Sequence, residues 1–114
     1  MARISSVSSK TKSPFDKFCE ASFSKMDADS KVQLKNSLLS DAMLKILSDS
    51  ELSESLNAFF ENNLNISETS RNTFVHRNTL VYRLDKIEKL TGFDARKFED
   101  AVCIRMFMWL KKHG

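Results

Sequence analysis

The chain has 114 residues, a length that suits one small domain and leaves little room for a second. Hydrophobic residues make up 41% and charged residues 29%, as in ordinary globular proteins, and no apolar run reaches the roughly 18 residues that a membrane-spanning helix needs. Two glycines and one proline are too few for an all-β fold, and the net charge of +3 is compatible with a nucleic-acid partner without requiring one.

The first part of the chain is predicted to be a leader followed by a helical segment. Residues 1–12 are rich in Ser and Lys and show no periodicity, so we predict a disordered leader. Residues 13–48 should be helical. The sequence SPFD at 13–16 places a capping serine, a proline and an acid in the order typical of a helix start. Apolar residues at 31–48 recur at helical spacing, either in one helix or in two helices joined near Ser40.

Residues 49–114 are predicted to form the main helical domain. A capping cluster at 48–51 begins a helix that ends within ENNLN at 61–65. The elements expected after it are a short helix capped by Ser67 and running to about Phe74, a helix from about Arg77 to Leu90 stopped by Gly92, and a last helix at about 98–112 after a loop with Asp94 as its cap. The last helix is apolar on nearly every side, so we expect it to be buried all round.

The helix at 77–90 combines a packing face with a polar first turn. At 100° per residue, Leu84, Ile87 and Thr91 fall within about 40° of Leu80, which predicts a row packed on the preceding helices. The residues expected to face outward are Asn78, Tyr82, Asp85 and Lys89. Only about three residues separate this helix from the short one before it, a spacing typical of a helix-turn-helix whose second helix enters the major groove.

Side chains suited to DNA gather at this point of the chain. The candidate DNA-binding residues are His76, Arg77, Asn78, Thr79, Tyr82, Arg83, Lys86, Ser67 and Thr69. Arg77 can bond to guanine, Asn78 to adenine, and the Thr79 methyl can meet thymine. Hydroxyls and basic side chains suit phosphate oxygens. A plain amphipathic helix is the alternative, with His76 as a cap and Tyr82 as a packing residue.

Residues 61–106, ENNLNISETSRNTFVHRNTLVYRLDKIEKLTGFDARKFEDAVCIRM, closely resemble the C-terminal helix-turn-helix domain of the PucR/CdaR family, which are bacterial transcription regulators of purine and sugar-diacid catabolism. RNTLVYRL is also similar to the Fis-type recognition helix. The resemblance implies an all-α, Fis-like helix-turn-helix domain with five to six helices, and recognition residues at 76–79 and 82, with Arg83 as a backbone contact. The core residues that it implies are Leu56, Phe60, Ile66, Phe74, Leu80, Leu84, Ile87 and Leu90.

The family usually carries a large sensor domain before this module, so the chain is expected to be either a fragment of a longer regulator or a short stand-alone member. No small-molecule effector site is predicted in it. Phe15, Phe18 and Phe23 give the 13–48 segment an apolar side, and we expect a homodimer, with a single monomeric core as the alternative.

The function predicted from these patterns is sequence-specific binding of double-stranded DNA by a cytoplasmic transcription regulator. The alternative is a non-catalytic protein-interaction module that keeps the helix-turn-helix fold. No acid/base pair, glycine-rich phosphate loop or nucleophile with a partnering histidine is present, so no enzyme is predicted. Cys19 and Cys103 form no CxxC motif and no Cys/His cluster, so neither a metal site nor a cofactor is expected.

Overall fold

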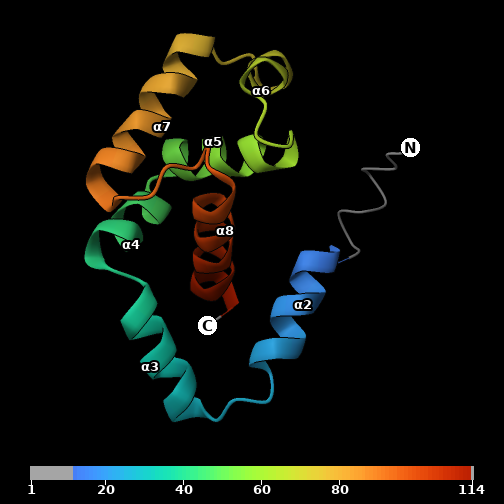
Figure 1. The fold of residues 1–114 in the computed structure, drawn as a ribbon, viewed down its shortest axis with the longest axis vertical. Coiled ribbons are helices and arrows are strands. Elements are labelled where there is room, and N and C mark those ends of the chain that lie inside the picture. Colours follow the sequence, from blue (N-terminus) through green and yellow to red (C-terminus); the bar gives the residue numbers. More distant parts are fainter. Residues whose placement is uncertain (1–11, 114) are drawn as a thin grey trace.

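The computed structural model describes residues 12–113, and the leader predicted at 1–12 therefore lies almost entirely outside the described residues. Within that range the chain forms seven helices and no strand (Figure 1). They are α2 (Pro14–Phe23), α3 (Ala28–Leu38), α4 (Asp41–Ser48), α5 (Ser50–Glu61), α6 (Ile66–Thr73), α7 (Arg77–Thr91) and α8 (Phe98–His113). The predicted all-α class is confirmed, and the helix count slightly exceeds the predicted five to six.

Short polar side chains fix where most of these helices begin. The N-caps of α2 to α6 are Ser13, Asp27, Ser40, Asp49 and Asn65. Each accepts a hydrogen bond from a backbone N–H in the first turn of its helix, which satisfies a donor that the helix itself leaves free. Ser40 settles the alternative left open for residues 31–48, because its cap on Met43 starts a second helix there. The prediction that Ser67 caps the short helix was wrong, since Asn65 caps α6.

The apolar core is built around α8, which lies in the middle of the molecule (Figure 1). One side of this helix is buried through Ala101, Ile104, Phe107 and Leu110. Phe107 packs edge-on against Phe93, with ring centroids 5.3 Å apart. The other apolar residues of α8 are half-buried, apart from Phe98, which is 74% exposed, so the expected burial on every side is not observed.

Helices α2 and α3 form an arm that packs against α8. Phe23 of α2 stacks on Trp109 with ring centroids 5.5 Å apart, and the guanidinium of Arg105 lies 4.7 Å from the centre of the Phe15 ring. Two of the three phenylalanines that suggested an unpartnered surface therefore have partners within the chain. Phe18, by contrast, is 60% exposed.

Most of the core residues implied by the family resemblance lie inside, but two do not. Leu56, Leu80, Leu84 and Ile87 are buried, and Phe60 and Ile66 are partly buried against the core. The prediction that Phe74 is a core residue was wrong: it is 94% exposed and has a left-handed backbone in the turn between α6 and α7. The same prediction for Leu90 was also wrong, because Leu90 is 49% exposed at the edge of the apolar row of α7.

Candidate DNA-binding surface

Helices α6 and α7 form the predicted helix-turn-helix. α6 ends at Thr73, and α7 begins at Arg77 after a turn of three residues. The turn is held by side chains of α6: Ser70 Oγ donates to the carbonyl oxygen of Val75 (2.7 Å), and Thr73 Oγ1 accepts from the backbone N–H of Val75 (3.3 Å). In Figure 1, α6 and the first turn of α7 lie at one end of the molecule, opposite α3. Among the described helices, α6 also packs against α5, and no other helix is drawn at that end.

The two faces of α7 lie as the apolar periodicity predicted. Leu80, Leu84 and Ile87 are buried against the helices beneath, with at most 1% of each exposed. The opposite residues Asn78, Tyr82, Asp85 and Lys89 are exposed. The helix is therefore anchored along one face while its polar face and its amino-terminal end stay accessible.

Arg77 and Ser67 bring the amino-terminal ends of α7 and α6 together. Arg77 Nη1 donates to Ser67 Oγ (2.9 Å), and both residues are exposed. A guanidinium has five N–H donors, so one bond to a hydroxyl leaves several donors available for base edges or phosphates. The bond also orients the arginine before any ligand arrives.

His76 caps α7 with its imidazole ring. His76 Nδ1 accepts a hydrogen bond from the backbone N–H of Asn78 (3.0 Å), and an imidazole that accepts through one ring nitrogen has the other as its donor. The Nε2–H group of this exposed side chain is then a donor for an outside acceptor. Asn78 is exposed and Thr79 is half-buried, which leaves both able to touch a molecule at the tip of α7.

The structure gives Thr69 and Arg83 a different setting from the one expected. Thr69 is fully buried and its hydroxyl donates to the carbonyl oxygen of Asn65 (2.7 Å), so it has no surface for the phosphate contact that was predicted. Arg83 reaches α5, where Nη1 donates to Ser55 Oγ (2.9 Å) and Nη2 lies 3.8 Å from a carboxylate oxygen of Glu51. Arg83 thereby ties α7 to α5, whereas Lys86 is exposed.

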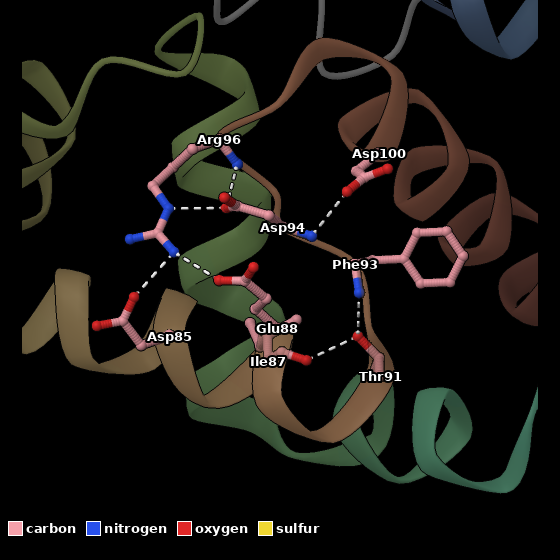
Figure 2. Close-up of polar contacts among 8 residues, drawn as sticks. All are labelled: Asp85, Ile87, Glu88, Thr91, Phe93, Asp94, Arg96 and Asp100. Atoms are coloured by element: carbon pink, nitrogen blue, oxygen red, sulfur yellow. Dashed lines mark hydrogen bonds and ion pairs between the residues drawn. The ribbon is translucent and has the colours of Figure 1, made fainter.

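A cluster around Arg96, which was not predicted from the sequence, lies at the other end of α7 (Figure 2). The Arg96 guanidinium contacts Asp94 (2.7 Å), Asp85 (2.8 Å) and Glu88 (3.2 Å). Burial alone would raise the pKa of Asp94, but the hydrogen bonds from Arg96 outweigh it and hold that pKa below its ordinary value. Asp94 was wrong as a cap of the last helix, because its carboxylate binds Arg96; its own backbone N–H donates to Asp100 at the start of α8 (3.0 Å).

The same region also ends α7 and sets the path to α8. Gly92 adopts the left-handed conformation (φ +84°) and closes the helix, as predicted, by donating to the carbonyl oxygen of Glu88 (2.8 Å). Thr91 Oγ1 donates to the carbonyl oxygen of Ile87 (2.7 Å) and accepts from the N–H of Phe93 (3.1 Å) (Figure 2). The Arg96 cluster and this closed turn together fix α7 against the core.

Arg96 also changes the electrostatics of the exposed face of α7. Asp85 and Glu88 both lie on this helix and would repel a phosphate backbone if left unpaired. Because both pair with one cation, their charges are offset by a residue outside the helix. The positive charges of Lys86 and Lys89, which are exposed on the same helix, are then opposed less strongly.

Two other features are absent from residues 12–113. No group of three or more His, Cys, Asp or Glu side chains in this range is arranged to hold a metal ion. None of the helices in this range is long and apolar enough to cross a membrane.

Comparisons with known proteins bear on the same segment. Residues 52–109, from α5 into α8, match the model of the PucR C-terminal helix-turn-helix domain. An uncharacterized protein of Bacillus subtilis (strain 168) is 36% identical over 63% of this chain and 24% of its own length. The purine catabolism regulatory protein of the same organism is 34% identical over 68% of this chain. The carbohydrate diacid regulator of Escherichia coli (strain K12) is 41% identical over 52% of this chain. The aligned parts are 14% and 15% of these two regulators, so the chain spans about a quarter or less of these relatives.

Proposed function

The chain belongs to the PucR C-terminal helix-turn-helix family, as the motifs at 61–106 predicted, and on that premise we propose that it binds double-stranded DNA sequence-specifically as part of a cytoplasmic transcription regulator. The observation that carries this proposal is the split character of α7. Its apolar row is buried, while Arg77 and Asn78 are exposed at its free end. A helix held in this way can enter the major groove with its first turn leading.

Each exposed residue of the tip has a chemical role in this proposal. Arg77 reads guanine through O6 and N7, and Asn78 reads adenine through N6 and N7. Thr79 offers its methyl group to thymine. His76 donates from Nε2, and Ser67 lies at the amino-terminal end of α6, where backbone amides favour a phosphate.

The remaining candidates act on the flanks of the groove or through α7 itself. Lys86 and Tyr82 are exposed along α7 and contact the DNA backbone in this proposal. Arg83 holds α7 on α5, and only the part of its guanidinium not bonded to Ser55 is available to a phosphate. Thr69 has no DNA contact in the proposal because it is buried.

The first experiment is selection of bound duplexes from a random pool, followed by gel shifts of the selected sequence at two salt concentrations. We expect tight, salt-sensitive binding that survives unrelated competitor DNA. Arg77→Ala should weaken binding of the selected sequence by about 1–3 kcal/mol and relax the preference at one base pair. Arg77→Lys should keep much of the affinity for unrelated DNA but lose that preference, because lysine lacks the planar fork.

The control is Lys31→Ala, which removes one positive charge from exposed α3 at the opposite end of the molecule (Figure 1). It should leave the preference and the affinity nearly unchanged. The proposal is refuted if the pool yields no preferred sequence at any salt concentration. That outcome would favour the alternative of a protein-interaction module.

A homodimer is part of the same proposal. The α2–α3 arm exposes Phe18 and Val32, which are 60% and 54% exposed, and exposed apolar patches on a protein often mark an interface. A two-fold dimer would also place two α7 helices on a palindromic site. Sedimentation of the parent and of Phe18→Asp tests this: a parent that sediments as a monomer at all concentrations contradicts it.

A further inference from the structure

Phe74 has a strained backbone conformation, and no packing of its side chain within the chain offsets the free-energy cost. It follows the last residue of α6 with φ +58° and ψ +24°, the left-handed region in which glycine is the favoured residue. Leu64 has a similar φ of +62°, but its side chain packs against the hydrophobic core. Phe74 packs against nothing comparable, since 94% of it is exposed.

The exposure of Phe74 does not come from a loosely held turn. Ser70 and Thr73 bond to the carbonyl oxygen and the N–H of Val75, the next residue, and the Thr73 hydroxyl also donates to the carbonyl oxygen of Thr69 (2.7 Å). These bonds fix the backbone on both sides of Phe74. A strained residue held firmly in place, with a large apolar side chain in solvent, is the kind of outlier that accompanies a binding role.

The position of Phe74 identifies the partner. It lies two residues before His76 and three before Arg77, in the turn at the same free end of the molecule as the tip of α7 (Figure 1). Resting on the proposed function, we infer that Phe74 is an additional DNA contact whose ring packs against deoxyribose at the edge of the major groove. Phe74 lies in the turn before α7 and not in the helix itself. In this inference its ring therefore contacts the edge of the major groove, while the first turn of α7 enters the groove.

The chemistry of a phenyl ring determines what kind of contact this is. It has no hydrogen-bonding atom, so it cannot read the donors and acceptors on base edges. It carries no charge, so it displaces no counterions from phosphates. Contacts to the sugar and backbone position a protein on the duplex without carrying sequence information. Phe74 should therefore add affinity equally for all sequences.

The test uses Phe74→Gly, which removes the ring and also relieves the left-handed strain. We expect the variant to melt at or above the temperature of the parent, yet to bind duplex DNA about tenfold more weakly. The loss should be equal for the duplex selected by the protein and for an unrelated duplex, and the slope of log affinity against log salt should not change. A basic residue that contacts phosphate would instead lower that slope by about one unit.

Two further variants separate the ring from the backbone conformation. Phe74→Ala keeps the β-carbon and the strain, and it should lose the same affinity as Phe74→Gly. Phe98→Ala removes another exposed phenylalanine, on α8 in the middle of the molecule, and should bind DNA like the parent (Figure 1). Equal DNA affinities for the parent and both Phe74 variants would overturn the inference while leaving the proposed function intact. If the parent binds no duplex, the proposed function itself fails.

Discussion

Replacing Arg96 with glutamine should destabilise the domain more than any other single loss of a surface arginine. The guanidinium contacts three carboxylates, of which Asp94 is the most buried and the closest. Glutamine keeps a similar length and a hydrogen-bonding head but removes the charge. The three carboxylates would then face one another without a cation, at the junction that holds the end of α7 against α8.

The size of the effect follows from how exposed each partner is. Asp85 and Glu88 are about half-exposed, so each pair contributes roughly 0.2–1 kcal/mol at most. The bond to Asp94 is charge-assisted and more shielded, and such bonds contribute about 1.5–3 kcal/mol. Because the three contacts share one guanidinium, they do not simply add. We expect a loss of about 2 kcal/mol in the free energy of unfolding.

Urea denaturation at a series of pH values measures this loss. The pKa of Asp94 is lowered in the folded protein, so its contribution is present in full above the unfolded value of about 3.9 and disappears as the pH falls through the lower folded value. The difference between parent and Arg96→Gln should therefore be largest near neutral pH and shrink below about pH 3.9.

The matched control is Arg71→Gln, which breaks the exposed i,i+3 pair of Arg71 with Glu68 on α6. It should cost no more than about 0.5 kcal/mol. Equal losses for the two variants, or a loss in Arg96→Gln that persists unchanged at pH 2, would show that Arg96 does not act through Asp94.

Three further predictions concern the core, the end of α7 and the thiols. Ile87→Ala should cost about 2–5 kcal/mol by urea denaturation, because Ile87 is fully buried, whereas Leu90→Ala should cost less than about 1 kcal/mol since half of Leu90 is in solvent; equal costs would contradict the burial assigned to Leu90. Gly92→Ala should cost about 1–2 kcal/mol through its left-handed backbone alone, because a β-carbon there would meet no atom within 4 Å, and an unchanged midpoint would refute this. Burial raises the pKa of the Cys19 thiol, so iodoacetamide at pH 8 should alkylate Cys103 first in the folded protein; faster labelling of Cys19 would contradict its burial.

Local sequence patterns predicted the elements well because their causes are local. Capping by Ser13 and the stop at Gly92 depend on residues within one helical turn, and both were confirmed. The apolar row of α7 follows from the helical period: Leu80, Leu84 and Ile87 are buried, and Thr91 is half-buried. The prediction that Leu90 is buried was wrong because the same helical period places Leu90 about 80° away from Leu80 around the helix, at the edge of the row.

The features that the sequence did not reveal depend on distant residues. Arg96 meets Asp85 and Glu88 only because the turn after α7 folds back along that helix. Arg83 was predicted to contact the DNA backbone, but in the folded chain it bonds to Ser55 of α5, which is distant in the sequence. Phe74 was assigned to the core by the family resemblance, whereas the left-handed turn places it outside. Pairings of this kind carry no periodic signal.

The packing of α2 on α8 has a consequence for how this chain is made in the cell. Phe23 stacks on Trp109, and Asp16 lies 3.8 Å from Arg105, so the earliest described helix finds its partners on the last one. The ribosome makes α2 before α8, with five helices between them. Helix α2 therefore cannot pack on α8 until α8 has been made, whereas the helices between them can pair locally as they emerge. We expect the packing of α2 on α8 to be among the last steps in the folding of this domain.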